Sequence, residues 1–249
     1  TIAPMLPKTW ELRLVDVNVT PLRDEDLAWA DYALISAMTV QQDSAREIIA
    51  RCKAADLTVV AGGPLFTMQP HEFARPDHLV LNEAEITLPR FLADLARDQA
   101  ERVYATEGYA DIQASPAPMW DLADLDAYDG MAIQFSRGCP FACDFCNITA
   151  LLGRRPRTKT GAQIIEELDA LYHLGWRRSV FFVDDNFIGN KRVLKEDVLP
   201  ALIEWHKDKV GLPFNTEASI NLADDEELMD MMVEAGFNKV FIGIETPDD

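Results

Sequence analysis

Three of the four cysteines, Cys139, Cys143 and Cys146, fall within eight residues of one another. They lie on a stretch that also contains glycine and proline, so they are expected on an irregular loop. Thiolates at such spacing can wrap one cubane iron–sulfur cluster. An electron-transfer ferredoxin would supply a fourth cysteine nearby, but the remaining one, Cys52, lies far upstream. Three protein ligands would leave one iron of the cluster free to bind a small molecule. Catalytic zinc sites differ from structural ones in the same way, because they keep one position open.

Other interpretations of these cysteines stay open. A structural zinc site would need a fourth Cys or His. The nearest downstream candidate, His173, is predicted on a helix 27 positions past Cys146. The thiols could also be reactive and unligated. A disulfide scaffold is disfavoured because the four cysteines are few and unevenly placed.

Acidic and amide side chains stand at the ends of strand-like segments downstream. One segment ends in Asp184, Asp185 and Asn186, another carries Glu217, and a third ends at Glu245. Carboxylates at the ends of buried apolar strands are costly unless they bind something. In β/α barrels, functional groups gather at the carboxyl ends of the strands. We predict that these five residues bind a cofactor; the alternative for Asp184 and Asn186 is a role as helix caps or loop residues.

The only dense basic run, Gly-Arg-Arg-Pro-Arg-Thr-Lys-Thr, spans residues 153–160. It is suited to a carboxylate, a phosphate or an anionic substrate. Arg157 is the favoured ligand because it follows Pro156 in a constrained segment. The alternative is a solvated loop that enters the next helix with Thr160 as its N-cap.

Strand and helix patterns alternate in the first hundred residues, which favours a parallel sheet. The opening strand of a nucleotide-type sheet is missing, and the last strand of the chain has no helix after it, so we expect a piece of a longer protein. The predicted strands are Glu11–Val17, Asp31–Ala37, Leu57–Ala61 and His78–Leu81, and the predicted helices are Ser44–Ala55 and Ile86–Arg97.

A second alternating series begins at Met131, after the Pro-bearing stretch Gly108–Asp129, which is typical of a linker. Its helix Asp225–Ala235 has acids in the first turn and Gly236 as the expected C-cap. The other predicted helices are Ala162–Leu174 and Val193–Trp205, and the strands are Met131–Ser136, Ser179–Asp184, Phe214–Ile220 and Lys239–Glu245.

The amino-terminal series has its own candidate binding loops. Ser36 and Thr39 follow one predicted strand, and Gly62 and Gly63 follow the next. Strand ends on one edge of an open α/β sheet are where ligands bind. Glycines allow close approach of a ligand to the backbone, although the pair can also simply make a turn.

Composition excludes several classes of protein. The chain has 249 residues, with 23 Lys and Arg against 42 Asp and Glu, a net charge of −19. Such a surface repels phosphate backbones, so a nucleic-acid-binding domain is not expected. The apolar runs are too short for a transmembrane helix, and no secretory signal is apparent. A cytoplasmic location is predicted.

Around its cysteines the chain resembles the radical SAM superfamily, whose signature is C-x3-C-x2-C with an aromatic residue before the last cysteine, here Phe145. The resemblance covers about Met131 to Thr246. It implies a partial (β/α)6 barrel in which a [4Fe-4S] cluster cleaves S-adenosylmethionine (SAM) and Phe145 packs against the adenine.

The first part resembles cobalamin-binding domains, and by that match Ser36, Thr39, Gly62 and Gly63 line the pocket for the nucleotide tail. The implied order is a Rossmann-like cobalamin-binding domain at 1–105, a linker at 106–130 and a radical SAM core at 131–249.

The string from Phe135 to Lys159, together with Val183–Asn190, looks closest to hopanoid methylases and their relatives. This implies cobalamin-dependent methyl transfer to a small molecule or lipid, with one SAM methylating cobalt and another yielding the radical. A flavodoxin or ferredoxin would be the reductant. The alternatives are a radical SAM enzyme of another reaction type, such as cyclisation or ring contraction, and a non-catalytic cobalamin and iron–sulfur sensor.

Overall fold

The computed structural model describes residues 2–244. The chain divides into two compact units, one up to Ala110 and one from Asp111 onward. Each unit contains its own parallel sheet of four strands. The predicted parallel α/β architecture is therefore confirmed. Among the described residues, no helix has both the length and the hydrophobicity needed to cross a membrane.

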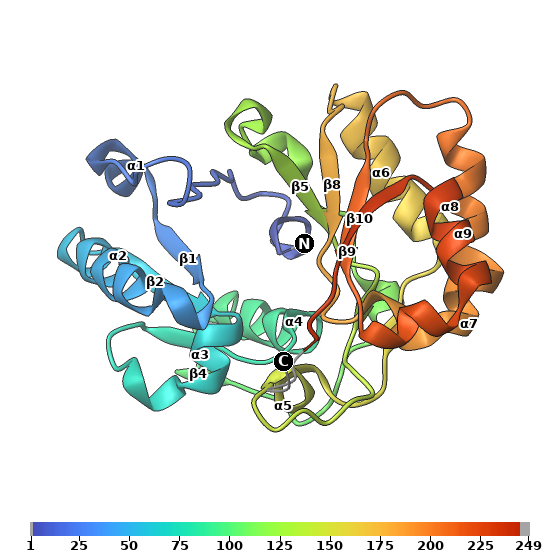
Figure 1. Ribbon diagram of the computed structural model, residues 1–249. Helices are drawn as coiled ribbons and strands as arrows, with labels where there is room; N and C mark the ends of the chain where they lie inside the picture. Colours follow the sequence, from blue (N-terminus) through green and yellow to red (C-terminus); the bar gives the residue numbers. More distant parts are fainter. Residues whose placement is uncertain (1, 245–249) are drawn as a thin grey trace. The chain divides into compact units, whose positions relative to one another are not determined.

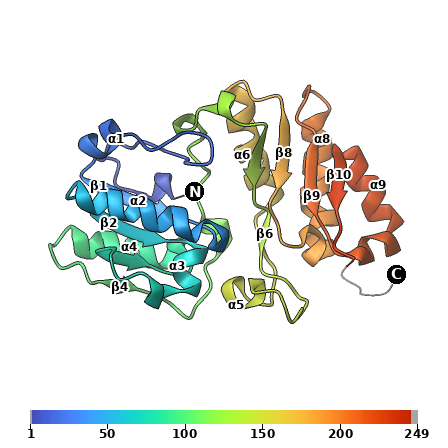
Figure 2. The same cartoon turned by 60° about the vertical axis from the view of Figure 1, so that its left-hand side comes forward.

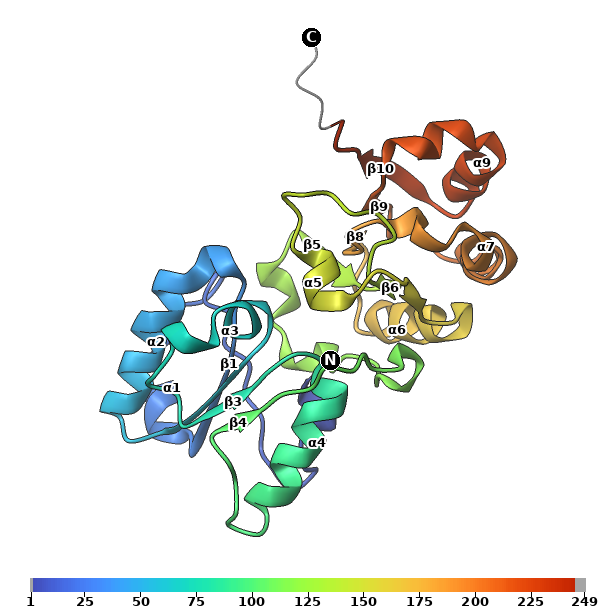
Figure 3. The ribbon, with the colours of Figure 1, turned by 90° about the horizontal axis from the view of Figure 1, so that it is seen from below.

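The sheet of the first unit has the strand order β1-β2-β3-β4. Residues alternate between its two faces: Val59 and Ala61 pack with helices α2 and α3, whereas Val60 and Val80 pack with α4. Figure 3 shows the helices on both sides of this sheet. The elements are α1 (Asp24–Trp29), β1 (Tyr32–Ser36), α2 (Gln42–Ala54), β2 (Thr58–Gly62), α3 (Pro64–Met68), β3 (His78–Val80), α4 (Ala84–Leu95) and β4 (Val103–Tyr104).

The predicted strand Glu11–Val17 is wrong. Its residues form no strand, and the backbone turns at once after it, where the N–H groups of Val19 and Thr20 donate to the Asp16 carbonyl. The Asp16 carboxylate also accepts from the Asn18 N–H at 3.0 Å, which is an Asx-type turn. Local side-chain bonding thus competes with strand pairing here, and β1 begins the sheet instead.

The second unit has the strand order β10-β9-β8-β5, with every neighbouring pair parallel. Its helices α6, α8 and α9 lie along one face of this sheet (Figure 1). The strands are β5 (Gly130–Ile133), β8 (Ser179–Phe182), β9 (Phe214–Glu217) and β10 (Phe237–Phe241), and the helices are α5 (Ile148–Leu152), α6 (Gly161–His173), α7 (Lys191–Val193), α8 (Leu199–His206) and α9 (Glu226–Glu234).

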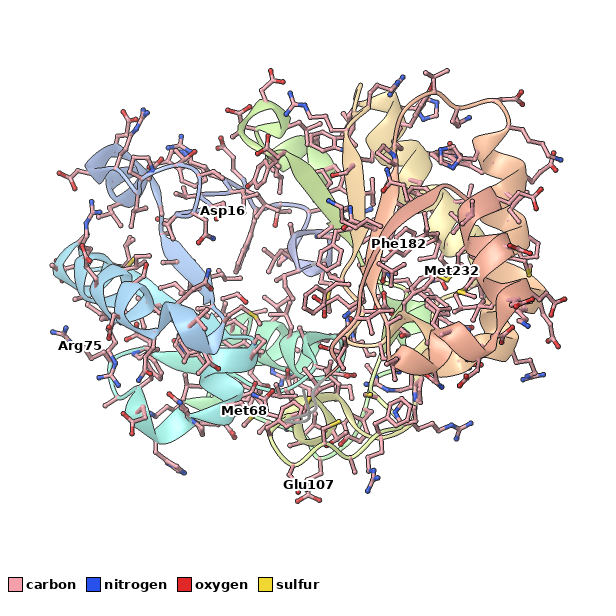
Figure 4. The ribbon with its side chains drawn as sticks, viewed as in Figure 1. Asp16, Met68, Arg75, Glu107, Phe182 and Met232 are labelled. Atoms are coloured by element: carbon pink, nitrogen blue, oxygen red, sulfur yellow. The ribbon has the colours of Figure 1, made fainter. Side chains whose placement is uncertain are left out.

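An aromatic cluster fills the space between this sheet and its helices. The ring of Phe182 lies 5.3 Å from both Phe187 and Phe214, centroid to centroid. Phe182 on β8 and Met232 on α9 both belong to this core (Figure 4). Rings of this size bury a large apolar area, so the cluster fixes the strands that carry the candidate site.

The helix ends follow their sequence signals. Thr160 caps α6 by accepting from the Gln163 N–H at 3.3 Å, and Asp225 caps α9 by accepting from the Leu228 N–H at 3.2 Å. Gly236, with φ +101°, follows α9 as predicted. The predicted helix Val193–Trp205 is interrupted by a π-helical turn at Leu194–Val198, just before Pro200, whose missing N–H cannot continue the helical bonding.

A short antiparallel ribbon was not predicted. It pairs β6 (Ser136–Arg137) with β7 (Arg157–Thr158), and the residues between them carry the three clustered cysteines. The ribbon extends from one end of the second sheet toward α5 (Figure 2). Within the stretch interpreted as a linker, Trp120, Leu125 and Tyr128 pack against the core of the second unit.

Candidate functional site

The three clustered cysteines share the irregular loop between β6 and α5. None forms a disulfide; Cys143 is exposed, and Cys139 and Cys146 are half-buried. The Cys146 N–H donates to the Cys143 carbonyl at 3.1 Å, which turns the chain between the second and third thiols. The Cys139 N–H donates to the Gly153 carbonyl at 3.2 Å, so the first cysteine is held against the returning arm of the loop, the segment between α5 and β7.

The donor set suits an iron–sulfur cluster, since three unpaired thiols stand on one loop. Across residues 2–244, no three His, Cys, Asp or Glu side chains are grouped closely enough to hold a metal ion. Burial raises the pKa of the Cys139 thiol, the Phe141 N–H opposes the rise, and the nearby Cys146, Asp185 and Cys143 add to it. Cluster binding by these thiols stays a prediction.

Gly138 joins the ribbon to the cysteine loop. Its φ is +95°, and a Cβ placed there would lie 2.9 Å from the carbonyl oxygens of Arg155 and Gly153 and 3.0 Å from that of Leu152. Only glycine accommodates this combination of backbone angle and close packing. The residue before Cys139 therefore fixes how the outgoing and returning arms of the loop approach each other.

Asp184 points into the core side of the second sheet. It is 1% exposed, and its carboxylate accepts from the Phe135 N–H at 3.0 Å, from the Ser136 hydroxyl at 2.6 Å and from the Ser136 N–H. These three hydrogen bonds hold the segment after β8 against Phe135 and Ser136, where β6 begins. The Asp184 oxygens therefore bind donors of the protein itself, whereas a cofactor ligand is expected to have an oxygen open to the cofactor.

Asn186 is also buried, and it binds the next strand end. Its side-chain oxygen accepts from the Ser219 N–H and hydroxyl, both at 3.2 Å. Asp184 and Asn186 are thus turned to the two neighbouring strands. Between them, Asp185 is exposed.

Asp185 and Glu217 are the carboxylates that remain available. Glu217, the last residue of β9, is half-buried, and Asn215 lies on the same face of the strand because side chains alternate with a period of two. Asp185 follows β8 and Glu217 ends the neighbouring strand β9, so the two carboxylates stand at adjacent strand ends. Burial raises the pKa of Asp185, a backbone hydrogen bond lowers it, and the negative charge of Glu217 raises it further. The negative charge of Asp185 also raises the pKa of Cys139. Glu245 lies outside the described residues.

Aromatic side chains flank the cysteines. Phe145 is 73% exposed and Phe141 is 43% exposed. An exposed phenylalanine beside a cysteine loop is available to stack on a planar ligand. Phe141 was not singled out from the sequence, although its position between two of the cysteines was a usable signal.

The basic run divides into buried and exposed residues. Lys159 is 5% exposed and forms a 2.5 Å ion pair with the buried Glu167 on α6. Arg157 is half-buried, and its guanidinium donates to the Leu152 carbonyl at 2.9 Å. Arg154 and Arg155 are exposed, and their side chains form no ion pair with another described residue.

The candidate loops of the first unit meet at one edge of its sheet. Ser36 and Gly62 end paired strands β1 and β2, and the Leu65 N–H donates to the Ala37 carbonyl at 3.0 Å. Gly63 has φ +84°, and a Cβ there would lie 2.4 Å from the Ser36 hydroxyl oxygen. Thr39 is exposed at the start of a 3-10 turn, Thr39–Gln41.

Two apolar side chains in this edge loop were missed from the sequence. Met38 is 56% exposed and Val40 is 94% exposed. Because the two exposed side chains are only two residues apart, they form a small apolar patch of the kind that a ligand can cover.

The chain is similar to known proteins in sequence and in fold. Residues 133–249 match the radical SAM superfamily, so the second unit contains a radical SAM domain. The chain is 51% identical over its full length to an uncharacterized methyltransferase of Synechocystis sp., of which it covers 47%. It is 40% identical over 99% of its length to the hopanoid C-2 methylase of Rhodopseudomonas palustris, covering 48% of that protein. The chain thus spans about half the length of these relatives.

Among solved structures, the chain resembles the radical SAM methyltransferase TsrM of Kitasatospora setae, in a complex with tryptophan substrate and a SAM analogue. The TM-score is 0.71 at 17% identity, covering 90% of this chain and 51% of that one. Another structure of TsrM holds cobalamin and a [4Fe-4S] cluster. This likeness concerns the fold.

Proposed function

We propose that this chain is the cofactor-binding part of a cobalamin-dependent radical SAM methyltransferase. Its substrate would be an unactivated carbon of a small molecule or lipid of hopanoid type. The observation that carries the proposal is the loop of three unpaired thiols within a chain that is 40% identical to a hopanoid C-2 methylase over 99% of its length.

The second unit is proposed to hold the cluster and SAM. Cys139, Cys143 and Cys146 would ligate three irons of a [4Fe-4S] cluster as thiolates. When bound, the cluster would supply the electron that cleaves the sulfonium bond of SAM, and cobalamin would supply the methyl group. The chain's own part is to bind, orient and exclude water.

The polar residues of this unit would divide the work. Asp185 and Glu217 are exposed or half-buried at adjacent strand ends, which supports contacts with the ribose hydroxyls and the ammonium group of SAM. Phe145 would stack on the adenine and Arg157 would face an anionic group. Asp184 and Asn186 would act indirectly, because their side chains hold neighbouring strand ends. A role for Glu245 at the same strand ends stays part of the proposal.

The first unit is proposed to hold cobalamin. Ser36, Thr39, Gly62 and Gly63 would line the pocket for the nucleotide tail, and the exposed Val40 supports a ligand at this edge. We assign residues 1–105 to the cobalamin-binding domain, 106–130 to a linker and 131–249 to a partial (β/α)6 barrel. A flavodoxin or ferredoxin would be the reductant, in the cytoplasm.

Anaerobic reconstitution of the whole protein tests the proposal. With SAM, cobalamin, a reductant and a hopanoid substrate, we expect 5′-deoxyadenosine, S-adenosylhomocysteine and a methylated product. Deoxyadenosine without methyl transfer would instead indicate another radical reaction, such as cyclisation. Bound corrinoid with intact SAM would indicate a sensor and refute an enzymatic function.

Substitution of one thiol tests the cluster assignment. Cys143→Ala is expected to abolish SAM cleavage, because the cluster would lose one of its three protein ligands. Cys52→Ala is the matched control, since Cys52 is a buried core residue of the first unit and should leave SAM cleavage intact. Undiminished deoxyadenosine formation in Cys143→Ala would refute the assignment.

A further inference from the structure

Positive charge is concentrated around the cysteine loop. Residues 137–159 contain four arginines and one lysine but a single acid, Asp144, a local net charge of +4 from 5 − 1. The whole chain carries −19. A cationic segment in so acidic a protein creates a local field that is opposite to the field of the rest of the surface.

The structure shows which of these cations face solvent. Lys159 is neutralised by Glu167 in a buried pair, and Arg157 donates to a loop carbonyl. Arg137 is half-buried, and its guanidinium donates to the Gln134 side chain at 2.8 Å. Arg154 and Arg155 are left exposed, next to each other on the returning arm of the loop.

These two arginines adjoin the first cysteine through the backbone. Gly153, the residue before Arg154, accepts the Cys139 N–H at 3.2 Å. The Arg155 carbonyl oxygen would lie 2.9 Å from a Cβ on Gly138. A macromolecule that binds these guanidinium groups would therefore dock beside the loop that carries the thiols.

We propose that Arg154 and Arg155 form the docking surface for an acidic one-electron carrier protein of the flavodoxin or ferredoxin class. The inference rests on the proposed function, because it requires a redox cluster on the cysteine loop. In the electron-transfer step, the carrier loses one electron and the cluster gains it, and no covalent bond forms or breaks between the proteins.

Charge complementarity favours a protein partner. Both side chains are exposed, so they offer a surface and lack the enclosed donors that hold a small anion. An acidic carrier would be repelled by most of a surface with net charge −19, and only a local cationic patch would orient it productively. The same patch would raise the association rate at low salt.

The test uses the whole protein and a purified acidic flavodoxin. Binding is measured by titration calorimetry on cluster-free protein, and cluster reduction is followed by stopped-flow absorbance on reconstituted protein. The variant Arg154→Glu/Arg155→Glu moves the net charge by −4. The control Arg192→Glu/Lys207→Glu makes the same change at side chains that are 78% and 60% exposed elsewhere in the second unit.

We expect the Arg154→Glu/Arg155→Glu variant to weaken flavodoxin binding and slow cluster reduction by about tenfold or more at low ionic strength, with the difference shrinking at high salt. Arg154→Lys/Arg155→Lys should restore most of the binding, and the control should change it little. Reduction by reduced methyl viologen, a small cation, should not slow in the variant.

Equal losses in the variant and the control, or an unchanged affinity in the variant, would overturn the proposal. So would loss of binding to anionic phospholipid vesicles with flavodoxin binding intact, because the patch would then serve a membrane surface. A failure of methyl transfer alone would count against the proposed function only, since flavodoxin binding is measured without turnover.

Discussion

Asp184 and Asp185 are adjacent acids with opposite surroundings. Along β8 and beyond, Val180, Phe182 and Asp184 are buried, whereas Phe181 and Val183 are half-buried and Asp185 is exposed. The strand's period of two therefore sends the two carboxylates to opposite faces. Asp184 joins strand ends, and Asp185 remains exposed after β8, next to the strand that ends at Glu217.

Removing the Asp184 carboxylate should destabilise the second unit. Asp184→Ala leaves the N–H groups of Phe135 and Ser136 without their acceptor, at a cost of roughly 1–3 kcal/mol for each buried donor. Asp185→Ala removes an exposed carboxylate and should change stability by less than about 0.5 kcal/mol. Urea unfolding measures both; equal unfolding free energies for the two variants would contradict the assignment of roles.

Asp184 should also impose a pH dependence on stability. Burial raises its pKa to about 7, against the hydrogen bonds from Ser136 and Phe135. The unfolded chain releases this proton near pH 4. Between these values the folded state binds more protons, so this group makes the unfolding free energy fall as pH rises from about 4 to about 7, and then level off.

Asp184→Asn removes this contribution. The stability advantage of the wild type over Asp184→Asn should therefore be largest near pH 4 and shrink by up to about 1.4 kcal/mol for each pKa unit of the shift as pH rises. Urea titrations at several pH values in this window measure it. Parallel stability curves for the two proteins would show that Asp184 has an ordinary pKa.

At the scale of elements, the β6–β7 ribbon positions the cysteine loop. Two residues on each side make the ribbon, too few for a strand pattern in the sequence. The Lys159 N–H also donates to the Phe135 carbonyl at 2.9 Å, which continues the link between the two arms. The loop's geometry therefore depends on contacts between residues about 20 positions apart.

Gly138→Ala should disrupt this arrangement. The new Cβ would meet three carbonyl oxygens at 2.9–3.0 Å in addition to the strain of φ +95°. Gly175→Ala is the matched control, since Gly175 has φ +92° with no heavy atom within 4 Å of the same Cβ position. We expect both variants to lose roughly 1–3 kcal/mol from backbone strain, but only Gly138→Ala to lose further stability and bound iron after reconstitution. Equal iron contents would contradict this role.

At the scale of the whole molecule, the two units have separate hydrophobic cores. Damage at one proposed cofactor site should therefore leave the other intact. Gly63→Ala would place a Cβ 2.4 Å from the Ser36 hydroxyl and is expected to lower corrinoid binding with iron content unchanged. Cys143→Ala should do the reverse. Absorption spectra and iron analysis of both reconstituted variants measure this; joint loss of both cofactors in either variant would contradict it.

The sequence by itself determined the alternation of most strands and helices, the position of Thr160 before one helix and of Gly236 after another, and the thiol spacing that matches the radical SAM superfamily. Periodicity and capping depend on residues that are close together in the sequence, so they can be recognised without the structure. Tertiary structure decided which polar residues face a ligand. Residues 180–183 are all apolar, so no alternation in the sequence reveals the face that Asp184 takes. The face that Asp184 takes is determined by packing against the helices and by hydrogen-bond donors 48 and 49 positions away. The exposure of Arg154 and Arg155 next to a buried Lys159 is likewise a property of the tertiary structure.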